Sequence, residues 1–284
     1  MAFRIEKDSM GELQVPAEKY YGAQTQRSLN NFEINDEKFP REFIRAYGIL
    51  KKSASLVNCR NNKIEPKLSD AICLAADEVI DGKLDKHFPL VVWQTGSGTQ
   101  TNMNFNEVIS NRAIEILGGD IGSKIPVHPN DHVNMCQSTN DTFPTAINIA
   151  AVESTMHSLI PAIENLTNEL EKKSKDFDPI VKLGRTHLQD ATPLSLGQEF
   201  SGYAESMNNG IEKIKLSLNH CFELAMGGTA VGTGINSYEG FAEEVASEIS
   251  DITNLPFITA KNKFEALGGQ DSIVSLSSAL RGLA

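Results

Sequence analysis

Apolar side chains recur at spacings of three and four residues over much of the chain after residue 40, as they do along amphipathic α-helices. The first such run follows Pro40 and contains Phe43, Tyr47, Leu50 and Ala54. Further helices are expected over residues 68–82 and 104–117. The second of these is followed by Gly118 and Gly119, residues typical of a helix C-terminus.

Two later apolar stripes are much longer. The first comprises Ile149, Val152, Met156, Leu159, Ile163, Leu166 and Leu170. The second comprises Leu196, Phe200, Tyr203, Met207, Ile211, Ile214, Leu218 and Phe222. At 1.5 Å per residue each helix would be roughly 40 Å long, and helices of that length pack side by side as bundles. Pro161 lies within the first stripe and is expected to bend that helix.

No comparable run alternates apolar and polar residues, so we expect a mainly α fold. Residues 1–40 are turn-rich and are expected to form an extended arm with little regular structure. Two domains are predicted: a mixed, helical N-terminal domain over residues 1–138 and a long-helix bundle over residues 139–284. Because the last residues, DSIVSLSSALRGLA, still follow a helical pattern, we expect the bundle to be truncated at its C-terminal end.

Composition narrows the class of protein. The 284 residues include 26 Lys and Arg against 37 Asp and Glu, a net charge of −11, which argues against nucleic-acid binding. An acidic chain can still bind an anion if a local pocket of donors offsets its field. No apolar run approaches a membrane span, and the N-terminus has no secretory signal. We expect a cytoplasmic protein with no membrane partner and four reduced cysteines.

The first of four polar, glycine-bearing stretches is TGSGTQTNMNFNE, residues 95–107. It lacks the GxxxxGK pattern of a phosphate loop, and Thr101 stands where a GxGxxG pattern needs its third glycine. What it offers is hydroxyls and amides ahead of a helix, which suit a carboxylate as well as a phosphate. A loop that only caps the helix explains this stretch equally well.

The second stretch, HPNDHVNMCQSTND, covers residues 128–141. His128 and His132 are four residues apart, but Pro129 disfavours helical geometry at His128, so an anion-binding turn is favoured over a metal site. Its end, STND, stands directly before the first long helix, which Asp141 or Thr142 can cap. Capping explains one or two of these four residues but hardly the whole run.

The third stretch is GRTHLQDATP, residues 184–193, whose Pro193 is expected to open the second long helix. His187 lies in this polar turn rather than on an apolar stripe, which favours a functional imidazole over a structural one. The fourth, MGGTAVGTGIN at 226–236, resembles no nucleotide fingerprint and predicts either a close-packed crossing or a mobile loop. Together the four stretches suit carboxylate recognition with proton transfer beside the carboxylate, and no cofactor is expected.

Six blocks, in order, resemble the N-terminal and central part of a class II fumarase, within the fumarase/aspartase superfamily. They are DSMGELQVPAEKYYGAQTQRSLNNF, GSGTQTNMNFNEV, HPNDHVN, QSTNDTFPTA, GRTHLQDATPLSLGQEF and GGTAVGTGIN. Within the superfamily, fumarases are similar to this chain in THLQD, whereas aspartases typically carry glutamine in place of His187. The resemblance therefore implies a hydro-lyase that interconverts fumarate and (S)-malate. An aspartate ammonia-lyase and a non-catalytic helical assembly module are the alternatives.

The resemblance also implies roles for individual residues. His187 would take part in proton transfer. Substrate carboxylates would be bound by Ser97, Gly98, Thr99, Ser138, Thr139, Asn140 and Thr186. A secondary, non-catalytic dicarboxylate site would comprise His128, Pro129, Asn130 and Asp131. That site often includes a basic residue just upstream, where this chain has Ile125 and Pro126, with Lys124 as a substitute.

Two further expectations follow from the resemblance. Family members carry a GSSxMPxKxNP-type loop that supplies a serine base and a substrate-binding lysine, and nothing in residues 1–284 matches it. Family members are also homotetramers whose sites combine segments from three subunits. We therefore expect no metal, a small dicarboxylate substrate, a homotetramer, and little or no activity from residues 1–284 alone.

Overall fold

The computed structural model describes residues 2–284 and has a mainly α fold, as the sequence predicted. Contacts divide it into two compact units. The first contains the residues up to Ala150 together with Phe222–Gly269, and the second contains Ala151–Cys221 together with Gln270–Ala284. This grouping differs from the predicted boundary at residue 138, because the first three turns of α5 and the segment 222–269 pack with the N-terminal residues.

The first unit is built mainly from helices. They are α1 (Ala23–Asn31), α2 (Arg41–Arg60), α3 (Pro66–Ile80), α4 (Thr99–Ile116), the start of α5 (Thr139–Ser154), α8 (Phe241–Thr253) and α9 (Lys263–Gly268). The three helices expected after residue 40 are confirmed as α2, α3 and α4, although α4 begins five residues early. The core of this first unit includes the stacked rings of Tyr47, Phe105 and Phe88, and the ring centroids are 4.3 Å apart in each neighbouring pair.

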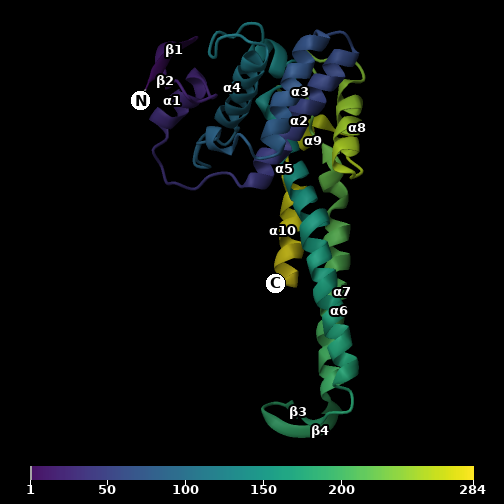
Figure 1. Ribbon diagram of the computed structural model, residues 1–284. Coiled ribbons are helices and arrows are strands. Elements are labelled where there is room, and N and C mark those ends of the chain that lie inside the picture. The colour runs from purple at the N-terminus through teal and green to yellow at the C-terminus, as the bar shows by residue number, and fades with distance from the viewer. Residues whose placement is uncertain (1) are drawn as a thin grey trace. The chain divides into compact units, whose positions relative to one another are not determined.

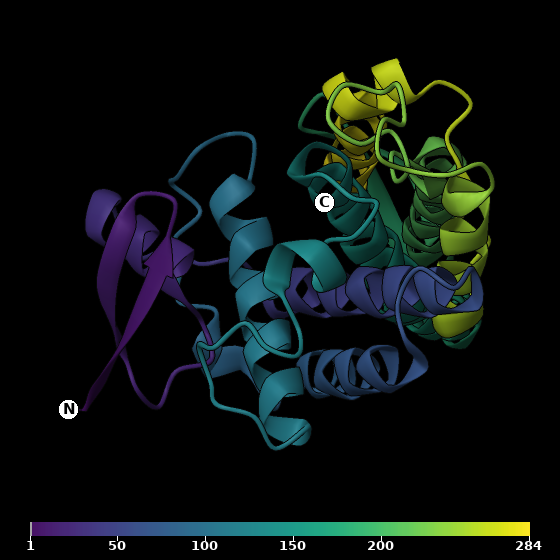
Figure 2. The ribbon, with the colours of Figure 1, turned by 90° about the horizontal axis from the view of Figure 1, so that it is seen from above.

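The expectation of an irregular N-terminal arm is wrong. Strands β1 (Phe3–Asp8) and β2 (Gly11–Pro16) form an antiparallel hairpin, followed by α1. Figure 2 shows this hairpin and α1 beside α4, which α1 contacts. The hairpin was missed because it is exposed on both faces and buries only Glu6 and Val15, so no clean apolar alternation marks it.

A buried carboxylate of α4 ties α1 to the rest of the unit. Glu107 Oε2 accepts hydrogen bonds from the backbone N–H groups of Gly22 (2.8 Å) and Thr25 (3.1 Å) and from the Thr25 hydroxyl, while Oε1 accepts from the backbone of Gln24. These groups lie at the N-terminus of α1, which has no side-chain cap of its own. Burial raises the pKa of Glu107, while the donors around it act in the opposite direction.

Replacing Glu107 by glutamine is expected to lower the free energy of unfolding by about 1–2 kcal/mol. The amide has a single oxygen, so its NH2 group must face at least one of the four donors. Urea unfolding of the full-length protein measures the effect. The control is Glu115→Gln, a partly exposed position of the same helix, where a change within about 0.5 kcal/mol is expected. Equal effects at the two positions would contradict this account.

The second unit contains two long helices, a hairpin and the C-terminal helix. Its elements are a π-helical turn (Thr155–Leu159), α6 (Ile160–Asp176), β3 (Val181–Thr186), β4 (Gln189–Ser195), α7 (Leu196–Ser217) and α10 (Asp271–Leu283). Figure 1 shows α6 and α7 side by side, joined at one end by the β3–β4 hairpin, and α10 packs on α7. Pro161 stands in the first turn of α6, directly after a π-helical turn, the kind of local irregularity that accompanies a missing N–H donor in a continuous helix.

The start of the second long helix differs from the prediction. Pro193 lies in β4, opposite Leu183, and α7 begins only at Leu196. Ser195 accepts a hydrogen bond from the backbone of Gln198, and the Gln198 side chain accepts one from the backbone of Ser195, which completes a capping box. This reciprocal pair is a stronger start signal than a proline. His187 is therefore in a hairpin turn and not at the mouth of a helix.

The remaining regular structure is short. Strands β5 (Glu223–Leu224) and β6 (Ile258–Thr259) pair in parallel, and single helical turns cover Asp85–His87, Pro129–Val133 and Asn219–Phe222. Over residues 2–284, no helix has both the length and the apolar character that a bilayer crossing requires.

Candidate active site

The start of α4 presents two exposed hydroxyls on a tight turn. Ser97 Oγ lies 3.2 Å from Thr99 Oγ1, and Gly98 between them has a φ of +74°. A Cβ at Gly98 would lie 2.1 Å from the ring of Phe143, in the first turns of α5. Only glycine therefore permits both this backbone conformation and the close approach of the two helix starts.

The start of α5 carries the second group of predicted residues. Ser138 Oγ accepts from the backbone N–H of Asn140 (3.3 Å), and Asp141 Oδ1 accepts from the backbone N–H of Ser138 (2.9 Å). The cap is thus Ser138, and the prediction that Asp141 or Thr142 caps the helix is wrong. Asp141 lies in the first turn of α5, and its side chain accepts from the backbone N–H of Ser138, as the third helical residue does in a capping box.

The two helix starts are linked by a side-chain hydrogen bond. Asn102, in the first turn of α4, donates from Nδ2 to Thr139 Oγ1 at 3.2 Å. The structure therefore places two predicted groups close together in the first unit: Ser97, Gly98 and Thr99, and Ser138, Thr139 and Asn140. Backbone N–H groups and hydroxyls at two adjoining helix N-termini are suited to binding an anion.

Two buried charged residues near these helix starts, Lys51 and Asp141, were not among the predicted site residues. Lys51, on α2, is fully buried, and its Nζ donates to side-chain oxygens of Asn102, Asn134 and Gln137. Burial lowers the pKa of Lys51 to about 7, and the nearby Asp141 carboxylate opposes that shift. The sequence did contain a signal for this buried cation, because Lys51 follows Tyr47 by four residues and so lies on the buried face of α2.

The fourth polar stretch packs against α5. Asp141 Oδ2 accepts from the backbone N–H groups of Gly227 (3.1 Å) and Thr229 (2.8 Å), and Asn140 Nδ2 donates to the Ala230 carbonyl. A Cβ at Gly227 would lie 2.5 Å from Ala242 Cβ. Of the two alternatives for residues 226–236, these contacts support a close-packed crossing.

Thr186 and His187 belong to the second unit, whereas the helix starts belong to the first. His187 (φ +50°) and Leu188 (φ +62°) form the two-residue turn between β3 and β4. Positive φ at both positions defines the type I′ turn that matches strand twist. The turn projects His187 as an exposed imidazole at the tip of the hairpin.

The predicted secondary site forms one turn. His128 has extended backbone, as expected before a proline, and its Nδ1 accepts from the backbone N–H groups of Asn130 (3.3 Å) and Asp131 (3.1 Å). His132 Nδ1 in turn accepts from the backbone N–H of His128. Over residues 2–284, no three His, Cys, Asp or Glu side chains are grouped to hold a metal ion.

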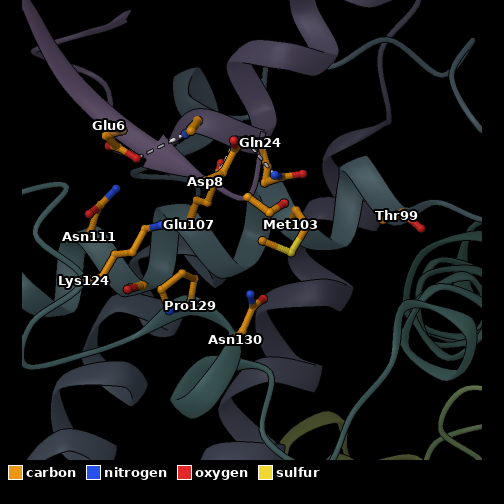
Figure 3. A pocket seen from close by; sticks show the side chains of 13 residues that line it. Glu6, Asp8, Gln24, Thr99, Met103, Glu107, Asn111, Lys124, Pro129 and Asn130 are labelled. Atoms are coloured by element: carbon orange, nitrogen blue, oxygen red, sulfur yellow. Dashed lines mark hydrogen bonds between the residues drawn. The ribbon is translucent and has the colours of Figure 1, made fainter. Parts of the chain in front are cut away.

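A cavity of 340 Å³ adjoins this turn in the first unit. Figure 3 shows Pro129, Asn130 and Lys124 on one side of it and Thr99 at its edge. Lys124 is the basic residue nearest the turn in sequence, and its Nζ donates to the Lys7 carbonyl. Thr99 therefore borders both the paired helix starts and the cavity beside the predicted secondary site.

Known proteins are similar to this chain over nearly all of its length. Mitochondrial fumarate hydratase of Danio rerio is 60% identical, over 100% of this chain and 56% of that protein. Fumarate hydratase class II of Rhizobium meliloti is 58% identical, over 99% of this chain and 61% of that protein. The crystal structure of recombinant class II fumarase from Schistosoma mansoni matches with a TM-score of 0.96 at 43% identity, over 99% of this chain and 62% of that chain.

These matches confirm the resemblance to class II fumarases. The chain spans less than two thirds of the length of these relatives. A family model described as Lyase matches residues 11–284. Since that match covers almost the whole sequence, the chain belongs to this lyase family.

Proposed function

We propose that the full-length protein is a hydro-lyase that interconverts fumarate plus water and (S)-malate. The observation that carries this proposal is the pair of adjoining helix starts, which bring Ser97 and Thr99 close to Ser138, Thr139 and Asn140. Their close approach depends on Gly98 against Phe143 and on the hydrogen bond from Asn102 to Thr139. Relatives that are 58–60% identical bear the name fumarate hydratase, which supports the same assignment.

The proposed roles follow from the charges that form in the reaction. Malate loses a proton beside one carboxylate, so negative charge accumulates on that carboxylate before the hydroxyl departs as water. Hydroxyls and backbone N–H groups of α4 and α5 would stabilise that charge, because they are oriented before it develops. The imidazole of His187, supported by Thr186, would move a proton near neutral pH.

The proposed assembly is a homotetramer with active sites shared between subunits. Thr186 and His187 lie in a different compact unit from the helix starts, which is compatible with sites that draw on several copies. The serine-lysine loop implied by the resemblance would come from the part of the protein outside residues 1–284. The turn at His128, Pro129, Asn130 and Asp131 is proposed as a secondary dicarboxylate site. A cytoplasmic location stays a prediction.

The full-length protein is expected to form malate from fumarate in water, and to form no aspartate when ammonium is added. Absorbance of fumarate follows turnover, and chromatography identifies the product. Aspartate as the main product would replace this proposal by an ammonia-lyase. No turnover with either nucleophile, from a folded full-length protein, would favour a non-catalytic helical assembly.

A further inference from the structure

Lys51 is the fully buried cation behind the paired helix starts. Its Nζ donates to Asn102 Oδ1 (2.8 Å), Asn134 Oδ1 (3.0 Å) and Gln137 Oε1 (2.9 Å). An ammonium group has three N–H donors and no acceptor, so three amide oxygens satisfy it completely. These oxygens belong to α4 and to the segment that leads into α5, and Lys51 thereby fixes both.

Lys51 determines which way the Asn102 amide faces. Asn102 Oδ1 accepts from Lys51 and from the Thr142 hydroxyl (3.2 Å), while Nδ2 donates to Asn134 Oδ1 (3.1 Å) and Thr139 Oγ1 (3.2 Å). The flipped amide would point its NH2 group at an ammonium that can only donate. With Lys51 protonated, as its three acceptor oxygens favour, the NH2 group of Asn102 faces Thr139.

The direction of this hydrogen bond decides what Thr139 can offer. Its oxygen already accepts from Asn102, so its single hydrogen is left for another acceptor. If Asn102 flipped, its carbonyl oxygen would take that hydrogen, and Thr139 would present only lone pairs to an incoming carboxylate. Thr139 is half-buried in the first turn of α5, where it belongs to the second donor group and contacts Asn102 of α4.

We infer that Lys51 is a positioning residue that acts through Asn102 to keep the Thr139 hydroxyl a donor toward the substrate carboxylate. This inference rests on the proposed dicarboxylate site. Lys51 would not touch the substrate, but it would determine that Thr139, which does touch it, acts as a hydrogen-bond donor.

A double-mutant cycle in the full-length protein tests the inference. Lys51→Met keeps the length of the side chain without its donors, and Thr139→Val removes the hydroxyl at nearly constant shape. Each single variant is expected to raise KM for fumarate, and the dissociation constant for malate, about tenfold, with a smaller change in kcat. The double variant is expected to bind no more weakly than Thr139→Val alone, because both changes remove the same donor.

Lys52→Met is the matched control. Lys52 is the next residue of α2 and pairs with Asp77 at 2.7 Å. Its replacement also removes one lysine charge from α2, but Lys52 takes no part in the contacts that link Lys51 through Asn102 to Thr139. Its KM is expected to equal that of the wild type. Additive effects of Lys51→Met and Thr139→Val, or an equal effect of Lys52→Met, would overturn the inference.

Asn102→Leu replaces Lys51→Met in the cycle if the methionine variant does not fold, and the same non-additivity with Thr139→Val is expected. Calorimetric titration of the wild-type protein with malate separates the proposed hydratase function from the proposed role of Lys51. A wild-type protein that binds malate without hydrating fumarate would refute the proposed function but still allow the cycle to be measured. A wild-type protein that binds no dicarboxylate would overturn both.

Discussion

Replacing His187 by asparagine in the full-length protein is expected to lower hydratase turnover by about 10²–10⁴-fold, the range typical of a lost general acid or base. The change should leave the hairpin intact. His187 has a φ of +50° in a type I′ turn, a conformation that asparagine adopts more readily than other residues with a side chain. Loss of turnover would then report the missing imidazole and not a disrupted turn.

Steady-state kinetics with fumarate and with malate measure this effect, and circular dichroism with size-exclusion chromatography checks fold and assembly. The matched control is His220→Asn, the same replacement at a histidine of the second unit that lies outside the proposed site. Its turnover is expected to stay within about twofold of the wild type. A His187→Asn protein with wild-type kcat would exclude His187 from proton transfer.

The helices were predictable where apolar residues define a buried face. The spacing of Phe43, Tyr47 and Leu50 marked α2 correctly, since these side chains are buried in the core. The start of α4 was placed late because its first turns carry Thr101, Asn102 and other polar residues. Those residues are nevertheless buried and hydrogen-bonded, and hydropathy alone cannot distinguish them from a loop.

Both hairpins escaped prediction for a related reason. Strands β3 and β4 have no consistently buried face, so their sequence shows no period of two. Pro193 was taken as a helix start, yet it lies opposite Leu183 in a two-stranded ribbon, where both strands are edge strands that tolerate proline. The His187 turn was correctly marked as polar, but only the pairing of Arg185 with Asp190 and of Thr186 with Gln189 reveals its hairpin geometry.

The candidate site was predicted in part. Clusters of Ser, Thr and Asn pointed to the neighbourhood of both helix starts, because such residues satisfy the free N–H groups there, although the start of α4 was placed five residues late. That the starts of α4 and α5 adjoin depends on Gly98 against Phe143, a tertiary contact with no local signature. Lys51 and Asp141 were missed as site-forming residues because each acts through partners far away in sequence.

Asp141 is a position of the first unit where a substitution should cost much stability. Replacing it by alanine in the full-length protein is expected to lower the free energy of unfolding by about 3–5 kcal/mol. This is the range typical of removing a buried charged group from its partners. The side chain is fully buried and accepts from three backbone N–H groups, those of Ser138, Gly227 and Thr229. Alanine would leave all three donors buried without an acceptor. Urea unfolding measures the loss.

Asparagine at the same position separates hydrogen bonding from charge. Burial raises the pKa of Asp141 and so disfavours its charge, whereas its backbone donors and the nearby Lys51 favour that charge. However, both oxygens act as acceptors, Oδ1 toward α5 and Oδ2 toward residues 226–236, and an amide provides only one. Asp141→Asn is therefore expected to lie between the wild type and Asp141→Ala. The exposed Asp70→Ala on α3 should change stability by less than about 0.5 kcal/mol. An asparagine variant as stable as the wild type would show that only one of the two contacts holds the helix start to the glycine-rich crossing.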